Sequence, residues 1–288
     1  MTIYYVDGKF VASDKAVIPV DDLSILRGYG ICDIMRTYNG SPYFLDEHIL
    51  RLENSAQKVG LSLPWNRAEI KEIILQTLIR NPDMDEANIR VVVTGGSSSD
   101  FFTPQEKPRL IVMVTPIPPL PDAWYSKGIK TITLHQERDV PEAKVTSYIQ
   151  AALALKAAKE QNAVEVIYVN RKNEALEGTT SNLFAFFKDR MVTADQGVLK
   201  GITRKLILSL GHRLFAVEER PLKLEELFRA DEVFITGTNK GVVPVIQIDD
   251  QIIGQGKPGK NTGRMIQALA QHSHDFRKTI HDIKIQEK

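Results

Sequence analysis

A proline-rich stretch at residues 116–121 divides the chain. It reads Pro-Ile-Pro-Pro-Leu-Pro, so four of its six residues lack a backbone N–H and cannot extend a helix or a sheet ladder. Such a segment suits an extended connector. With 288 residues and an apolar share of 43%, the chain is long enough to form two cores. We therefore expect a small N-terminal domain over residues 1–116, a linker at 117–121 and a larger C-terminal domain over 122–288.

Turn and strand signals alternate in the first part of the chain. The dipeptides Asp7-Gly8 and Asn39-Gly40 are typical of tight hairpin turns. Runs rich in β-branched residues predict strands at 90–94 and 110–115. The polar loop between them, at residues 95–108, is long enough to suggest a functional role.

Helix signals follow the second hairpin. Asp46 is placed to cap a helix that Gly60 ends, and Asn66 precedes a further helix with Glu69 three residues on. Beyond the connector, the patterns predict strands at 131–134, 164–169, 183–187, 191–193 and 233–236, and helices at 148–161, 203–210, 224–229 and from Asn261. The fold class is therefore α/β, with α+β character in parts.

The composition excludes several classes of function. Lysine and arginine total 37 against 36 for aspartate and glutamate, so the formal net charge is +1. This balance favours a small ligand over nucleic acid or an acidic membrane. One cysteine, Cys32, and six scattered histidines predict neither a disulfide nor a metal site. The N-terminus lacks a signal-peptide pattern and no run approaches the roughly 20 apolar residues of a membrane span, so we expect a cytoplasmic protein.

Two segments stand out by their position between elements. Lys144 lies between a proline-broken strand end and an apolar, alanine-rich helix. Glu177 precedes the small residues Gly-Thr-Thr-Ser, which lead into an apolar strand. Taken alone, these are a surface lysine at a helix start and ordinary turn chemistry.

Further segments suit an anion. Gly201-Ile202-Thr203 opens a helix and offers free backbone N–H groups and a hydroxyl. Thr236-Gly237-Thr238, at the end of a strand, offers the same groups. Together with Arg51 these segments could hold one phosphate, although each also has an ordinary cap or turn interpretation.

The order and spacing of these segments resemble those of the class IV aminotransferases, the fold-type IV enzymes that use pyridoxal 5'-phosphate. Residues 44–52 resemble the motif of that family's N-terminal domain. Residues 177–184 together with 199–204 resemble its signature, and residues 233–238 resemble its last cofactor loop. The resemblance covers nearly the whole chain and implies a two-domain fold-type IV aminotransferase-like fold and a transaminase activity.

The resemblance also implies a role for each matching residue. Lys144 would form a Schiff base with the cofactor aldehyde and then move the α-proton of the substrate. Glu177 would keep the pyridine nitrogen protonated, and Tyr148 would hydrogen-bond the ring hydroxyl. Leu199 would pack on the ring. The implied cofactor site comprises Arg51, Lys144, Tyr148, Glu177, Thr180, Ser181, Leu199, Gly201, Ile202, Thr203 and Thr238, with Arg51, Ile202, Thr203 and Thr238 on the phosphate.

Substrate choice depends on the arginines of the N-terminal domain. Arg36 and Arg90 resemble the two arginines of branched-chain aminotransferases, which implies transfer between an aliphatic L-amino acid and a 2-oxo acid such as 2-oxoglutarate, in a ping-pong cycle. Cys32 departs from that pattern, because those enzymes usually carry an aromatic residue there. Ser181 departs as well, because it replaces the acid that commonly precedes the asparagine.

Other activities stay open at this point. Leu26-Arg27-Gly28-Tyr29-Gly30 resembles an atypical branch of D-amino-acid transaminases in which Arg27 receives the carboxylate. The Arg-x-His trap of the best-known D-amino-acid transaminases is absent from residues 95–104. An aminodeoxychorismate lyase uses the same lysine and cofactor, and a catalytically silent cofactor-binding protein would keep the same fold. The resemblance further implies a homodimer at least.

Overall fold

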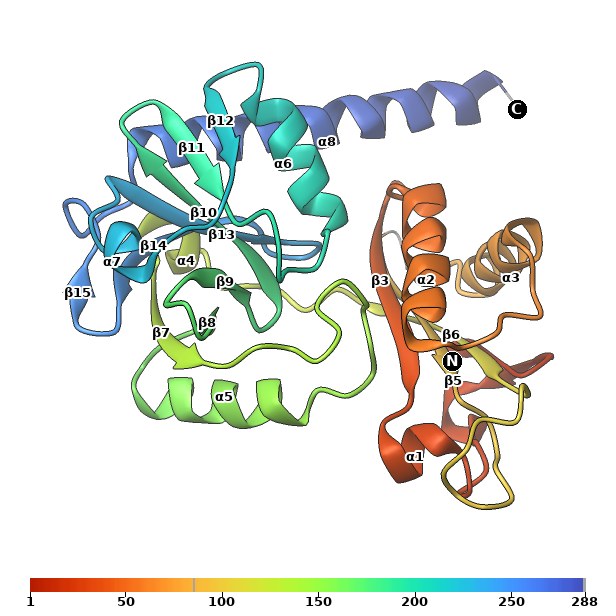
Figure 1. The fold of residues 1–288 in the computed structure, drawn as a ribbon. Helices are drawn as coiled ribbons and strands as arrows, with labels where there is room; N and C mark the ends of the chain where they lie inside the picture. The colour runs from red at the N-terminus through yellow and green to blue at the C-terminus, as the bar shows by residue number, and fades with distance from the viewer. Residues whose placement is uncertain (85, 287–288) are drawn as a thin grey trace. The chain divides into compact units, whose positions relative to one another are not determined.

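The computed structural model describes residues 1–84 and 86–286. The chain forms two compact units, whose elements are labelled in Figure 1. The first contains residues 1–118, the short segment 142–148 and the chain from Phe276, and the second contains residues 119–141 and 149–275. The contiguous domain boundaries expected at residues 117–121 stay a prediction.

The first unit is a six-stranded antiparallel sheet with helices packed on it. The strand order is β2-β1-β6-β5-β3-β4. The strands are β1 (Ile3–Val6), β2 (Lys9–Ala12), β3 (Gly30–Tyr38), β4 (Ser41–Pro42), β5 (Ala87–Thr94) and β6 (Arg109–Pro116), and the helices are η1 (Ser13–Lys15), α1 (Leu23–Arg27), α2 (Leu45–Val59) and α3 (Arg67–Ile79). Alternate residues of β3, such as Ile31 and Met35, pack into one apolar cluster with Ile49 of α2 and Ile74 of α3.

The two hairpin turns predicted in this unit are present. Asp7 and Gly8 have φ of 45° and 92° between β1 and β2, and Asn39 and Gly40 have φ of 50° and 71° between β3 and β4. Asparagine and glycine tolerate this left-handed region, which the tight hairpin turn needs. Both hairpins are therefore confirmed.

Two helix starts were predicted in this unit, and one of them is confirmed. The Asn66 side chain accepts from the Glu69 N–H, and the Glu69 carboxylate accepts from the Asn66 N–H, a complete capping box. The cap predicted at Asp46 is wrong. Helix α2 already begins at Leu45, after Phe44 in a left-handed conformation, and Asp46 lies in the first turn.

The second unit is built on a nine-stranded sheet that closes on itself. The path runs β12-β11-β10-β13-β14-β7-β8-β9, and β9 also pairs with β10, so six strands form a closed ring. The strands are β7 (Ile129–His135), β8 (Glu165–Val169), β9 (Ala175–Gly178), β10 (Ser181–Phe187), β11 (Arg190–Thr193), β12 (Ala216–Glu219), β13 (Glu232–Gly237), β14 (Gly241–Ile248) and β15 (Gln251–Ile252).

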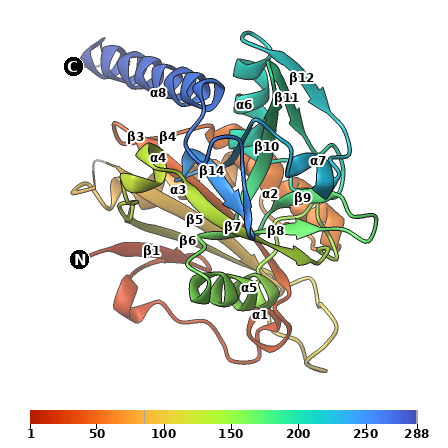
Figure 2. The ribbon, with the colours of Figure 1, turned by 90° about the vertical axis from the view of Figure 1, so that its left-hand side faces the viewer.

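Helices cover this sheet. They are α4 (Ala123–Ser126), α5 (Ile149–Glu160), α6 (Ile202–Gly211), α7 (Leu224–Leu227) and α8 (Lys260–Gln286). Helix α5 joins the parallel strands β7 and β8 and packs on them through Ala154 and Ala158 (Figures 1 and 2). The helices and strands predicted beyond the connector are confirmed, whereas further elements, among them α4, β9 and β12, were not predicted. The mixed α/β class is confirmed.

Two further findings concern the described part of the chain. Residues 1–84 and 86–286 contain no helix that is long and apolar enough to cross a membrane. Within the same residues, no three histidine, cysteine, aspartate or glutamate side chains gather as metal ligands.

Candidate functional site

The predicted site residues fall into two groups. Arg27, Arg36, Arg51, Arg90, Lys144 and Tyr148 belong to the first unit, and Glu177, Thr180, Ser181, Leu199, Gly201, Ile202, Thr203 and Thr238 belong to the second.

Backbone hydrogen bonds hold Lys144 on both sides. Its carbonyl oxygen accepts from the Cys32 N–H at 2.9 Å, and its own N–H donates to Ser55 Oγ at 3.0 Å. The next contact along the chain joins the Thr146 N–H to the Gly30 carbonyl at 2.9 Å. Lys144 is therefore anchored to the start of β3 and to α2, which leaves only its side chain free to move.

The amine of Lys144 faces a phenol. Lys144 Nζ donates to Tyr148 Oη at 3.0 Å. Burial disfavours the charged amine, but the neighbouring Tyr148 and Cys32 favour it more strongly, so the pKa of Lys144 lies above its ordinary value. The pKa of the Cys32 thiol is raised, chiefly by burial. The structure thus places a charged amine next to a second group that can exchange protons.

A buried carboxylate holds Arg51. Arg51 Nε and Nη2 donate to Asp33 at 2.8 and 2.7 Å, and His48 Nδ1 lies 2.7 Å from the same carboxylate. Asp33 is only 1% exposed. Burial alone would raise its pKa, but the Arg51 and His48 contacts outweigh burial and hold it well below the usual range. Arg51 Nη1 has no hydrogen-bond partner among the described residues, so it remains available to an anion.

Asp33 and His48 were not predicted from the sequence, although one signal was present. Asp33 lies between Ile31 and Met35 in the strand alternation, so a charged residue occupies the core-facing side of β3. A buried charge needs a partner, and α2 supplies two of them one turn apart, His48 and Arg51.

Two of the three candidate substrate arginines share one face of the first sheet. Arg90 pairs across the strands with Ile34, two residues from Arg36 along β3, so both arginines project from the face opposite to α2. Arg36 Nη2 lies 2.5 Å from one carboxylate oxygen of Glu86, whose other oxygen lies 2.6 Å from Arg277 Nη2. Arg90 is exposed and has no ion pair among the described residues.

Arg27 lies elsewhere in the same unit. It ends helix α1, its Nη1 donates to the Leu26 carbonyl at 2.8 Å, and its guanidinium lies 5.4 Å from the centre of the Phe102 ring. Phe102 is 71% exposed and belongs to the loop that the sequence marked as functional. A cation on an aromatic face keeps its charge available to a carboxylate.

Four N–H donors hold the Glu177 carboxylate in the second unit. Arg138 Nε and Nη2 donate to Oε1 at 3.0 and 2.7 Å, and Asn182 Nδ2 and the Leu199 N–H both donate to Oε2 at 3.0 Å. Glu177 is 5% exposed. Charge-assisted bonds of this kind fix both the orientation and the charge of the carboxylate. The sequence analysis did not find Arg138, because nothing in the local pattern around it points to Glu177.

Asn182 connects Glu177 with the start of helix α6. Its Nδ2 also donates to the Leu199 carbonyl at 2.8 Å. Gly201 is the N-cap of α6 and provides no side-chain cap, so the first-turn N–H groups of Ile202 and Thr203 point outward without one. A Cβ at Gly201 would overlap Asn182 Oδ1, so any other residue there would force the Asn182 side chain to move. The helix start therefore offers N–H donors and a positive dipole end to an anion.

The turn after β13 contains polar atoms that lack partners. Thr236 Oγ1 and Asn239 Oδ1 are buried and make no hydrogen bond with any described residue. They flank Thr238, the residue predicted to contact a phosphate. Because most buried polar atoms in proteins have a partner, this turn fits a ligand that comes from outside the chain.

The hydroxyl groups of Thr180 and Ser181 have a different partner from the one expected. Both donate to the carboxylate of Glu165, at 2.7 and 3.1 Å. Glu165 is fully buried at the start of β8, and the sequence analysis did not single it out.

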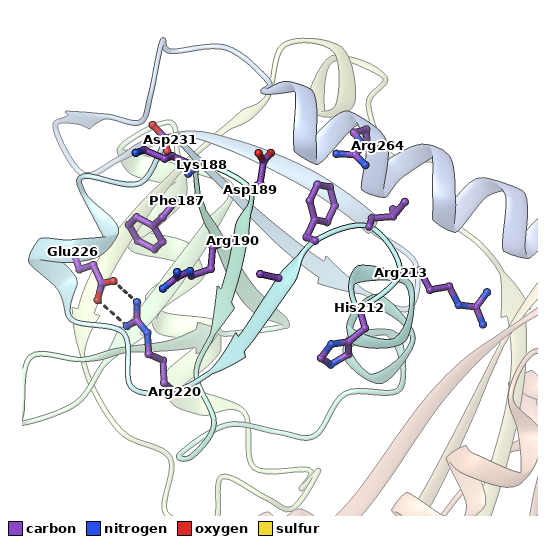
Figure 3. A pocket seen from close by; sticks show the side chains of 13 residues that line it. Phe187, Lys188, Asp189, Arg190, His212, Arg213, Arg220, Glu226, Asp231 and Arg264 are labelled. Carbon is purple, nitrogen blue, oxygen red and sulfur yellow. Dashed lines mark hydrogen bonds and ion pairs between the residues drawn. The ribbon is translucent and has the colours of Figure 1, made fainter.

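One pocket of the second unit lies away from these residues. Its volume is about 1020 Å³, and Figure 3 shows the Arg220 guanidinium facing Glu226 at its rim. It is lined by five cationic side chains and three acidic ones, Lys188, Arg190, Arg213, Arg220 and Arg264 with Asp189, Glu226 and Asp231, besides His212 and apolar residues. None of the predicted site residues lines it. A smaller pocket of about 530 Å³ includes Arg138, which binds Glu177.

Comparison with known proteins identifies the family. Residues 30–248 match the model of the family described as amino-transferase class IV. The chain is a class IV aminotransferase. Enzymes of this class depend on pyridoxal phosphate.

Three relatives illustrate the range of this aminotransferase class. A protein of Methanocaldococcus jannaschii named "Putative branched-chain-amino-acid aminotransferase" is 34% identical over 271 residues, which cover 91% of this aminotransferase and 93% of the relative. The D-alanine aminotransferase of Bacillus licheniformis is 30% identical over 269 residues, 91% and 94% of the two chains. The branched-chain amino acid aminotransferase from Escherichia coli superposes with a TM-score of 0.83 at 25% identity and 92% coverage of both chains.

Proposed function

We propose that this aminotransferase binds pyridoxal 5'-phosphate and moves an amino group from a branched-chain L-amino acid to a 2-oxo acid such as 2-oxoglutarate. The observation that carries the cofactor assignment is the connection made by Asn182. Its side chain bonds both the Glu177 carboxylate and the Leu199 carbonyl just before the α6 N-terminus. A ring nitrogen with a phosphate arm needs an acid for the nitrogen and N–H donors for the phosphate.

The residues of the second unit fit the ring and the phosphate. Glu177, held by four donors, would keep a proton on the pyridine nitrogen. The N–H groups of Ile202 and Thr203, with the Thr238 turn, would bind the phosphate. Leu199 would pack on the ring, and Gly201 lets the phosphate approach the backbone. Thr180 and Ser181 stay in the proposed site through their turn, because their hydroxyl groups bond Glu165.

The residues of the first unit fit the covalent and proton-transfer roles. Lys144 would bind the cofactor covalently and, once released by the substrate amine, would take the proton from the substrate α-carbon and deliver it to the cofactor carbon within the same half-reaction; with the 2-oxo acid it would run this transfer in reverse. Tyr148 would hold the ring hydroxyl, and Arg51 would add Nη1 to the phosphate donors. When bound, the cofactor supplies an electron sink that stabilises negative charge at the substrate α-carbon.

Arg90 is the proposed receptor for the substrate carboxylate. It is exposed and unpaired among the described residues, whereas Arg36 on the same sheet face is committed to Glu86. The L-branched-chain assignment is supported by the relative from M. jannaschii and by the branched-chain enzyme from E. coli. We further propose a cytoplasmic homodimer or larger homo-oligomer, as the family resemblance implies.

A D-amino acid is the second candidate substrate. The pairing of Arg36 with Glu86 removes one of the two arginines on which the branched-chain assignment depends. Arg27 keeps its charge available beside Phe102, and relatives named D-alanine aminotransferase are up to 30% identical to this chain. Arg27 would then receive the substrate carboxylate.

The visible spectrum of the purified protein loaded with pyridoxal 5'-phosphate tests these proposals. L-leucine and D-alanine are added separately with no 2-oxo acid present, so that only the first half-reaction occurs. Loss of the visible band with L-leucine alone supports the branched-chain assignment, and loss with D-alanine alone supports the second candidate. A stable band with every amino acid supports a silent cofactor-binding protein. No band after the cofactor is added refutes the cofactor assignment.

A further inference from the structure

A fully buried carboxylate lies beneath the turn that follows Glu177. Glu165 is 0% exposed, yet five donors reach its two oxygens. They are the Val166 N–H at 3.1 Å, the Thr179 hydroxyl, the Thr180 hydroxyl at 2.7 Å, the Ser181 hydroxyl at 3.1 Å and Lys240 Nζ at 2.6 Å. The Lys240 ammonium holds the pKa of Glu165 below its usual value against the opposing effect of burial.

Lys240 extends the same contact to a second turn. It lies between β13 and β14, two residues after Thr238. Besides Glu165, its Nζ donates to Thr180 Oγ1 at 2.6 Å, so three polar groups close a triangle. Its carbonyl oxygen accepts from Tyr125 Oη at 3.0 Å, which fixes the backbone of this turn from the other side.

The two turns approach each other as closely as their residues allow. A Cβ at Gly178 would overlap Ser181 Oγ and would lie 3.0 Å from Glu165 Cγ. A Cβ at Gly237 would lie 3.3 Å from the Thr180 carbonyl oxygen. Glycine at position 178 therefore lets its own turn pack on Glu165, and glycine at position 237 lets turn 237–240 pack on turn 178–181.

A buried ion pair of this kind adds little to the free energy of folding. Removing a carboxylate and an ammonium from water costs several kcal/mol for each ion, which their attraction often only balances. Apolar residues of similar volume would stabilise the fold at least as well. What a fully hydrogen-bonded ion pair adds is a fixed geometry, because each donor and acceptor has a single satisfied arrangement.

We propose that Glu165 and Lys240 are a positioning pair that sets the separation between the Thr238 turn and the turn that leads into Asn182. Asn182 bonds Glu177 and the segment before α6, so the pair connects three parts of the cofactor site in the second unit. This inference rests on the proposed function, because it assumes that these parts hold one rigid phosphorylated ring. Displacements of about 1 Å in such supporting contacts are enough to weaken binding.

Matched titrations with pyridoxal 5'-phosphate and with pyridoxal, which lacks the phosphate, test the pair. The wild type and the Glu165→Gln and Lys240→Met variants are titrated, and the ratio of the two dissociation constants is compared. We expect both variants to lower the preference for the phosphorylated form about tenfold, the size of effect typical of residues that orient a binding group. Lys240→Arg keeps the charge pair and should restore most of that preference.

Glu232→Gln is the matched control. Glu232 lies at the opposite end of β13 and accepts from the Asn261 and Thr262 N–H groups at the start of α8. The Glu232→Gln variant should lower the melting temperature and leave the preference for pyridoxal 5'-phosphate over pyridoxal unchanged. The double variant Glu165→Gln/Lys240→Met should lose no more preference than the worse single variant, because the two residues act as one unit.

The outcomes separate this inference from the proposed function. A wild type that binds neither compound refutes both. A wild type that prefers the phosphorylated form, with variants that lose melting temperature but keep the preference, overturns the positioning pair alone. The positioning pair is also overturned if the double variant loses as much binding free energy for the phosphate group as the two single variants lose together. If Glu165→Gln does not fold, the comparison of Lys240→Met with Lys240→Arg decides the question, because Lys240 is partly exposed.

Discussion

Asp33→Asn should destabilise the first unit strongly and disturb Arg51. The wild-type carboxylate accepts three contacts of 2.7 to 2.8 Å from Arg51 and His48. Asparagine keeps one oxygen and turns the other position into a donor that faces the guanidinium. Removing one partner of a buried ion pair costs about 3 to 5 kcal/mol, because the remaining charge stays buried without compensation. Since asparagine retains one acceptor, we expect about 3 kcal/mol at pH 7.

The assay is denaturant unfolding of the wild type, the single variants Asp33→Asn and Arg51→Met, and the double variant Asp33→Asn/Arg51→Met. The double variant should cost less than the sum of the single substitutions at Asp33 and Arg51, because it removes both charges together. A cost below about 1 kcal/mol for Asp33→Asn would show that the buried pair does not stabilise the unit. If the loss of unfolding free energy in the double variant equals the sum of the losses in the two single variants, Asp33 and Arg51 are not coupled.

The same pair predicts a dependence on pH. The pKa of Asp33 is lower in the folded chain than its value of about 3.9 in an unfolded chain. Its stabilising effect is therefore fully present above that unfolded value and is lost as the pH falls through the folded pKa. The stability difference between the wild type and Asp33→Asn should narrow progressively below about pH 4. A difference that stays constant from pH 7 to pH 3 contradicts this explanation.

The remaining predictions concern the proposed site. Lys144→Ala should abolish the visible band of the bound cofactor and reduce transamination by about 10⁴-fold, the upper range for a lost acid–base group; full activity would refute the assignment. Glu177→Gln should lower kcat about 100-fold with the cofactor still bound, measured by steady-state kinetics, because a neutral amide cannot hold the ring proton as an ion pair does. Arg90→Ala should lower kcat/KM about 100-fold, as expected for a lost charged hydrogen bond. Arg36→Ala should mainly lower the melting temperature. If Arg36→Ala lowers kcat/KM and Arg90→Ala lowers only the melting temperature, Arg36 and not Arg90 receives the substrate carboxylate. Gly201→Ala should weaken cofactor binding about tenfold in an absorbance titration, since its Cβ would displace Asn182, and unchanged binding would refute that contact.

Predictions from local signals succeeded where a single stretch of chain decides the structure. The Asn66 capping box and the two hairpin turns depend on residues within a few positions of each other. The cap predicted at Asp46 failed because Phe44, in a left-handed conformation, is the N-cap and the helix starts two residues earlier than predicted. The Asp46 carboxylate instead binds Lys71 of α3, a contact that no local pattern indicates.

The sequence by itself determined the fold class and the order of the motifs, and it made Lys144 and Glu177 the candidate residues for the chemistry, because motif order and residue type can be read along the chain. Only the tertiary structure decided which partners these groups have. Arg138 lies 39 residues from Glu177, and Lys240 lies 75 residues from Glu165. Strand pairing brings such residues together, and a buried charge then takes whichever partner the neighbouring strand or turn presents. The same reason separates Arg36 from Arg90, because Arg36 forms an ion pair with Glu86, which also binds Arg277, whereas Arg90 has no ion pair among the described residues.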